Sequence, residues 1–487
     1  MVSTSATITQ VAEAFALPES TQRDLSATGL VPDLLDTVAD TVTDTLGAVT
    51  GPVIDLAASI PTSLAAPTAA AAPAATTARA TPNIDPQQLV PQQVGDPAAL
   101  ATLTGLSLLQ QLSLLQEGAI ADFVAGHPES VQALIDAPPA AREVQLWWTA
   151  LGIDARSDLM TSAPYLVGNL EGVPLSLRYT ANSTYLTGSI AELNAATAGG
   201  RSEALDAATR LSMLQKVSQA LVAPPGAPAR SLLSLDPTGA GTAAIVIGDL
   251  TAADYVSILV PGMFYTVDGQ MAAWTTAAQS LYDEQVAWID DLGLGDATVA
   301  TVAWIGYETP SLVNFTSLDL AYGGSKALAD TVNGLHQLRG ADQPYLSLVA
   351  HSYGSTAAMM ALTDYGIDID SIGIIGSPGS SAQLASDLGV PGDNVYVGEA
   401  DWDQIKDSAF FGSDPGSSSF GAHKFRVAGG VDPLTGADLT GSTGHDEYLV
   451  AGSESLRNLA LVALGQGRLI TADDGNGLAK GATAYRY

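Results

Sequence analysis

The segment Tyr345-Leu-Ser-Leu-Val-Ala-His-Ser-Tyr-Gly-Ser355 decides the fold that we expect for this chain. Its first half is an apolar run typical of a buried strand, and the small residues of 356–362 that follow favour a helix. Ser352 stands at the bend, where a sharp turn lifts a hydroxyl clear of the sheet. Gly354 is the small residue that this crowded turn needs, whereas Ala350 replaces the glycine usual before the serine. We interpret the segment as a nucleophile elbow rather than as a serine that only caps a helix.

Short runs rich in Val and Ile surround this segment and alternate with longer helical stretches. This alternation is typical of a mostly parallel sheet with helices on its faces, so we expect residues 236–487 to form an α/β catalytic core. The candidate strands are 243–247, 256–260, 299–304, 346–350, 372–375 and 395–397.

The chain before this core divides into three parts by composition. Residues 1–60 contain one amphipathic helical pattern, which predicts a helical segment. Residues 61–96 include a run of Ala, Pro and Thr interrupted only by Arg79, and such a composition buries too little apolar surface to offset chain entropy. We interpret it as a disordered linker. Residues 97–235 are expected to be mainly helical and to pack on the core.

A serine hydroxyl needs a neighbouring base, and in this type of fold the order along the chain is Ser, then Asp or Glu, then His. Only His423 and His445 follow Ser352 and an acid. His445 lies in a glycine-bearing loop before a helical run expected at 448–464, whereas His423 lies at the edge of an apparent strand. His351 is expected to point elsewhere, because neighbouring side chains diverge. We assign the role of general base to His445.

The acid that orients the histidine is expected in the cluster Glu399-Ala-Asp-Trp-Asp403, directly after a candidate strand. Ligand chemistry gathers at the carboxyl ends of strands in open α/β sheets. We favour Asp403, because Ile405 provides an apolar anchor two positions on, and Asp401 is the alternative. Such a carboxylate would hold the histidine tautomer and stabilise the imidazolium.

Two backbone amides are candidates for the oxyanion hole, where each donor is worth about 10² to 10³ in rate. One belongs to Tyr353, directly after the serine, and the other to Met263, in the Pro-Gly turn after an upstream strand. Phe264, Tyr265 and Tyr307 lie near the expected rim. We predict that they bind an apolar acyl or aryl group, and the alternative is that they are core residues.

The composition limits which ligands suit the protein. Lys and Arg total 18 and Asp and Glu total 51, which gives a net charge of −33. A surface this negative repels nucleic acid and anionic lipid, so we expect no nucleic-acid partner. It suits a neutral or cationic substrate, such as a small-molecule or lipid-like ester.

The chain has no cysteine, which excludes disulfides, thiolate metal sites and cysteine nucleophiles. No phosphate-binding glycine motif or metal-ligand spacing stands out, so we expect neither a cofactor nor a metal. No stretch approaches the roughly 20 apolar residues that span a bilayer. We expect a secreted or cell-envelope protein whose leader is absent from this chain, with a cytoplasmic location as the alternative. Nothing in the sequence specifies an oligomeric state.

An ordered set of motifs between about residues 140 and 460 carries a family resemblance. The motifs are Val144-Gln-Leu-Trp-Trp148, Gly168-Asn-Leu-Glu-Gly-Val-Pro174, Ala181-Asn182, Leu259-Val-Pro-Gly-Met263, Val302-Ala-Trp-Ile-Gly-Tyr307 with Pro310, Val349-Ala-His-Ser-Tyr-Gly354, Ile375-Gly-Ser-Pro378 and His445-Asp-Glu-Tyr-Leu449. In this combination the sequence resembles the actinobacterial α/β-hydrolases long catalogued as a domain of unknown function. The resemblance implies the fold, the assignments of Ser352 and His445 and a serine-hydrolase reaction, but no substrate. Ala350 is its clearest departure.

Two hypotheses about function follow. The first is a carboxylic ester hydrolase that works through a Ser352 acyl-enzyme; amide or peptide cleavage and acyl transfer use the same machinery. The second is a non-catalytic, envelope-associated binding protein that retains the fold. The intact order of Ser, Asp and His favours the first.

Overall fold

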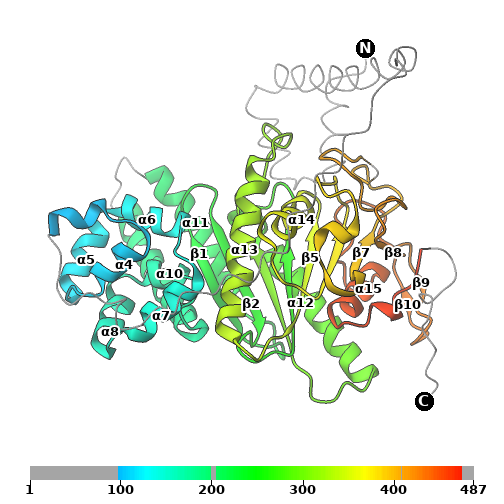
Figure 1. Ribbon diagram of the computed structural model, residues 1–487, viewed down its shortest axis with the longest axis horizontal. Coiled ribbons are helices and arrows are strands. Elements are labelled where there is room, and N and C mark those ends of the chain that lie inside the picture. Colours follow the sequence, from blue (N-terminus) through cyan, green and yellow to red (C-terminus); the bar gives the residue numbers. More distant parts are fainter. Residues whose placement is uncertain (1–96, 199–203, 407, 474–487) are drawn as a thin grey trace, which may run out of the picture. The chain divides into compact units, whose positions relative to one another are not determined.

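The computed structural model describes residues 97–198, 204–406 and 408–473, all within one compact unit, Asp85–Tyr487 (Figure 1). The predicted helical segment 1–60 and linker 61–96 lie outside the described residues. Within these ranges, no helix is both long and apolar enough to cross a membrane.

An eight-stranded sheet forms the centre of the unit (Figure 1). The strands are β1 (Arg230–Asp236), β2 (Thr242–Gly248), β3 (Tyr255–Val260), β4 (Val299–Ile305), β5 (Tyr345–His351), β6 (Ser371–Ile375), β7 (Val395–Gly398) and β8 (His423–Phe425). They lie in the order β1-β2-β4-β3-β5-β6-β7-β8. β2 pairs antiparallel with β1 and β4, and every other pair in this sheet is parallel. The α/β fold expected from the alternating pattern is therefore confirmed.

Helices cover both faces of the sheet. They are α12 (Val267–Asp291), α13 (Asp319–Arg339), α14 (Tyr353–Tyr365) and α15 (Glu454–Ala463). Successive residues of a strand point to opposite faces, so Leu348 of β5 packs in the core with α13 and α14, whereas Val349 packs with α12 and α15. A buried strand with apolar residues on both sides reads as a continuous apolar run, which is why the strands could be found in the sequence.

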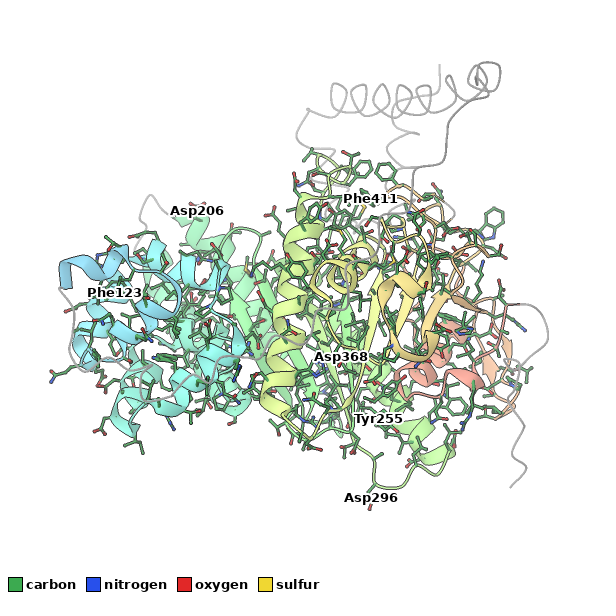
Figure 2. All side chains as sticks on the ribbon, in the orientation of Figure 1. Phe123, Asp206, Tyr255, Asp296, Asp368 and Phe411 are labelled. Atoms are coloured by element: carbon green, nitrogen blue, oxygen red, sulfur yellow. The ribbon has the colours of Figure 1, made fainter. Side chains whose placement is uncertain are left out.

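A helical layer precedes the sheet. Its helices are α4 (Gly105–Leu112), α5 (Glu117–Gly126), α6 (Pro128–Asp136), α7 (Ala141–Ala150), α8 (Ile153–Ser162), α9 (Pro164–Asn169), α10 (Leu175–Ala198) and α11 (Ala204–Ala220). The layer has its own core, which includes Trp147 and Phe123, the latter labelled in Figure 2. Helices α9 and α10 contact β1, α7 contacts α13 and α11 contacts α12.

Side chains of the helical layer form hydrogen bonds with the edge of β1 that pairs with no other strand of the described residues. The amide group of Asn169 exchanges two hydrogen bonds with the backbone of Leu235, as a neighbouring strand would. Asn182 and Arg178 both donate to the carbonyl of Leu233. Because the edge strand is bonded and covered in this way, it is not open to pairing with another chain.

The six candidate strands are present with bounds within one residue of those expected. Two expectations differ from the structure. The stretch 97–235 was expected to be mainly helical, but its residues 230–235 belong to β1. This strand was not predicted because a run rich in Leu and Ser has no clear strand preference and becomes a strand through pairing with β2. The helix after His445 begins at Glu454 rather than at 448, since Ser453 caps its first turn.

Candidate active site

Ser352 lies at the sharp turn between β5 and α14. Its φ of 53° and ψ of −133° fall in a region that residues other than glycine rarely occupy, at a cost of about 1–3 kcal/mol. The amide of Ser352 donates to the carbonyl of Ile375 at 2.9 Å. The amide and hydroxyl of Ser355 both donate to the carbonyl of Ser352, at 2.8 and 2.6 Å. Hydrogen bonds on both sides therefore hold the turn in its unfavourable conformation.

Small residues let the surrounding backbone approach this turn. A Cβ atom at Gly354 would overlap the carbonyl oxygen of Pro261, so only glycine allows α14 to pack this close to the end of β3. Ala350, which replaces the usual glycine, is fully buried in β5, where it pairs with Val260 and Ile374. The extra methyl group is therefore accommodated inside the sheet.

The structure brings Ser352, His445 and Asp403 into contact. Nε2 of His445 is 2.8 Å from Oγ of Ser352, and Nδ1 of His445 is 2.9 Å from Oδ1 of Asp403. An ionised carboxylate only accepts hydrogen bonds, so Nδ1 carries the ring proton and Nε2 accepts from the serine hydroxyl. Ser352 and Asp403 follow β5 and β7, which are parallel and end at the same edge of the sheet. His445 comes later, in the loop between β10 (Asp438–Leu439) and α15.

The carboxylate of Asp403 is buried and has a partner on each oxygen. Oδ1 also accepts from the amide of Ile405 at 2.9 Å, and Oδ2 accepts from the hydroxyl of Tyr448 at 2.6 Å. Burial opposes ionisation of this carboxyl, but hydrogen bonding and charge from His445, with the bonds from Tyr448 and Ile405, outweigh it and lower the pKa to about 2. Asp403 is therefore a carboxylate at neutral pH.

Asp401, the alternative acid, points into solvent. Its side chain is 88% exposed, and its carboxylate lies 3.8 Å from Nζ of Lys406. An exposed ion pair with a flexible lysine gives little directional control. The geometry therefore favours Asp403 as the residue that orients His445.

Two further residues contact the loops of the histidine and the acid: Tyr448, which the sequence did not single out, and His351, whose side chain was expected to point elsewhere but lies against His445. Tyr448 accepts from the amide of Ala400 at 2.8 Å while it donates to Asp403, so it joins the loops that carry the acid and the base. His351 is buried, and its Nε2 donates to the backbone carbonyl of His445 at 2.8 Å. Burial, together with the nearby His445 ring, lowers the pKa of His351 to about 3, so it is neutral. The only signal in the sequence was the position of both residues inside the family motifs.

The Pro-Gly turn after β3 lies against the serine. A Cβ atom at Gly262 would be 3.0 Å from Oγ of Ser352, which places the backbone of this turn beside the hydroxyl. The hydroxyl of Tyr307 donates to the carbonyl of Pro261 at 2.7 Å, and the amide of Phe264 donates to a carbonyl of the next loop. The amide of Met263 belongs to this fixed turn. The amide of Tyr353 is the first of α14 and so precedes the helical hydrogen-bond pattern.

Comparison with known proteins agrees with this fold. Residues 236–413 match a family model described as alpha/beta hydrolase. The sheet and its covering helices thus have the α/β-hydrolase fold. The matched residues include Ser352 and Asp403, and His445 lies beyond them.

The chain also resembles two uncharacterized proteins of Mycobacterium tuberculosis, from strains CDC 1551 / Oshkosh and ATCC 25618 / H37Rv. Each is 27% identical over 401 residues, which cover 71% of this chain and 59% of the relative. The alignment thus spans less than two thirds of the length of these relatives.

Solved structures resemble the chain more distantly. Carboxyl esterase 2 from Tuber melanosporum is 13% identical, with a TM-score of 0.28 over 50% of this chain and 87% of the esterase. An S-formylglutathione hydrolase from Agrobacterium tumefaciens is 12% identical, with a TM-score of 0.31 over 50% of this chain and 97% of its own. Values this low give no information about the substrate.

The three residues expected to bind substrate have different positions in the structure. Tyr307 has the core position that was the alternative for it: it is 4% exposed, stacks on Trp304 and donates to the Pro261 carbonyl. Phe264 is partly buried, with a φ of 66°. Tyr265 is also partly buried and packs edge-on against Trp274, 4.9 Å between ring centroids.

The aromatic side chain of Phe411 lies beside Tyr353, the residue after Ser352. The ring of Phe411, labelled in Figure 2, packs edge-on against Tyr353 at 5.4 Å between centroids. In the part of the chain that the structure covers, no three His, Asp or Glu side chains are grouped as a metal site would require.

Proposed function

We propose that this hydrolase cleaves a carboxylic ester through an acyl-enzyme on Ser352. His445 Nε2 takes the hydroxyl proton as Oγ attacks the carbonyl carbon, and Asp403 stabilises the imidazolium. The amides of Tyr353 and Met263 stabilise the oxyanion. Collapse of the intermediate breaks the ester C–O bond, and His445 returns its proton to the alcohol that leaves. Water, activated by the same histidine, then releases the acid.

The observation that carries this proposal is the pair of contacts of one imidazole, 2.8 Å to the serine oxygen and 2.9 Å to the carboxylate. Both distances are within the range in which a general base acts. The conformation of Ser352 adds support, because strain of this kind is maintained at sites where it serves the chemistry. A serine with only a structural role would not require this strained backbone conformation.

A fluorophosphonate probe tests the proposal, because only an activated serine reacts with it. We expect the full chain to be labelled once, at Ser352, and the Ser352→Ala variant to remain unlabelled. Ser381→Ala, at an exposed serine, is the matched control and should label like the wild type. Labelling that persists in Ser352→Ala, or no labelling of the wild type, would reject the proposal.

Amide hydrolysis and acyl transfer to an alcohol use the same three groups, so the substrate assay must separate them. We expect p-nitrophenyl esters to be cleaved much faster than the p-nitroanilides with the same acyl group. Faster cleavage of the anilides would assign an amidase. Preferred formation of a new ester when an alcohol is added would assign an acyltransferase.

A further inference from the structure

A cleft with a volume of about 390 Å³ opens between α12 and the loop of residues 446–451. We call it the α12 cleft. Its lining includes Tyr265, Ala273, Trp274, His351, Ile375 and Leu449. The volume is in the range of small-molecule sites, which are concave and mostly apolar. The small side chains of Ala273, Ala277 and Ser280 line the α12 side of the cleft and leave room between this helix and the loop.

Residues that line the α12 cleft are neighbours, along the chain or by a backbone hydrogen bond, of the residues at the candidate active site. His351 directly precedes Ser352, and the carbonyl of Ile375 accepts the amide of Ser352 at 2.9 Å. The loop that forms one wall begins directly after His445. Tyr265, which lines the cleft, lies two residues after Met263 along the chain. The lining of the α12 cleft thus comes from the chain segments that also carry Ser352, His445 and Met263.

The lining of the α12 cleft suits an uncharged apolar group. Trp274, Ile375 and Leu449 present hydrocarbon surface, and burial keeps Tyr265 a neutral phenol by raising its pKa. His351 is neutral as well. Asp446, at the cleft, and the net charge of −33 both oppose a carboxylate ligand. The cleft thus favours an ester over the acid anion that hydrolysis produces, which assists product release.

We propose that the α12 cleft binds the apolar acyl chain of the ester substrate. This inference rests on the proposed function and specifies its substrate class: esters of aliphatic acids with a chain long enough to leave the serine and enter the cleft. Burial of each additional methylene adds favourable free energy, so specificity should increase with chain length until the cleft is full.

The test compares neighbouring alanines of α12. Ala273 lines the α12 cleft, whereas Ala272 is exposed and lies outside its lining. Ala273→Phe should fill the mouth of the cleft, and Ala272→Phe is the matched control. A second variant, Ala277→Leu, narrows the cleft from a partly buried position. The readout is kcat/KM for p-nitrophenyl esters from acetyl to dodecanoyl, with fluorophosphonate labelling of Ser352 in each variant.

We expect the kcat/KM of the wild type and of Ala272→Phe to rise with acyl length. Ala273→Phe and Ala277→Leu should lose on the order of tenfold with the longer esters and nothing with acetyl. If the length profile of the wild type is flat, or the cleft variants keep it, the α12 cleft does not hold the chain. That result, obtained while Ser352 still labels, overturns this inference alone. Absence of labelling in the wild type overturns the proposed function as well.

Discussion

The two oxygens of Asp403 have different partners, which makes its replacement by an amide informative. In Asp403→Asn, the amide oxygen can keep the two donors on Oδ1, the Ile405 amide and Nδ1 of His445, and the NH₂ group then faces the Tyr448 hydroxyl. The neutral amide carries no charge to stabilise the imidazolium that forms when His445 takes the Ser352 proton. We expect kcat for ester hydrolysis to fall by about 10⁴. Initial rates at saturating substrate measure this.

Asp401→Asn is the control for this prediction, because its side chain is exposed and distant from the imidazole contacts. It should keep kcat near the wild-type value. The reverse result, with Asp401→Asn inactive and Asp403→Asn active, would move the orienting role to Asp401 and contradict the geometry.

Helix α14 begins directly after Ser352, so its distance from β3 determines the geometry of the turn that carries this serine. A Cβ atom at Gly354 would overlap the Pro261 carbonyl oxygen. In Gly354→Ala the helix must therefore move away from the turn that carries Met263. We expect a loss of about 1–3 kcal/mol in the free energy of unfolding, typical of overpacking, and slower labelling of Ser352. Urea unfolding and labelling rates provide the measurement.

Gly323→Ala tests whether this effect is steric. Gly323 lies inside α13, and a Cβ atom there has no atom within 4 Å outside its own helix. We expect this variant to gain up to about 1 kcal/mol from helix propensity and to label normally. Equal destabilisation of both variants would show that close packing at the elbow is not the cause.

The buried His351 makes the stability of the whole molecule depend on pH. Its pKa is about 3 when folded, against about 6.5 in an unfolded chain. Between these values only the unfolded chain binds the proton, so the free energy of unfolding falls as pH decreases, by at most about 1.4 kcal/mol per pH unit. Above about pH 6.5 this contribution is constant. Asp403, with a folded pKa of about 2, loses its stabilisation only below about pH 4.

His351→Gln tests this dependence, because glutamine does not titrate and its amide can still donate to the His445 carbonyl. We expect urea unfolding between about pH 7 and pH 5 to show a shallower loss of stability in this variant than in the wild type. Ser352 should still label at neutral pH. A variant curve parallel to that of the wild type would contradict the assignment.

The sequence predicted the sheet because its strands are buried on both faces and appear as continuous apolar runs, such as 346–350. It did not predict β1, whose Leu and Ser residues adopt a strand only through pairing with β2 and cover from α10. Nor did it exclude Tyr307 from the expected rim. Aromatic residues look the same in a sequence whether they line a site or lie beneath it.

By itself, the sequence determined the order of Ser, Asp and His and the small residues around Ser352, because local turn chemistry and chain order are properties of neighbours along the chain. Only the tertiary structure put Asp403 rather than Asp401 in contact with His445, linked Tyr448 and His351 to the loops of Asp403 and His445, and formed the α12 cleft. These features join residues that are tens of positions apart. Their contacts depend on how parallel strands align their loops at one edge of the sheet, which no local pattern encodes.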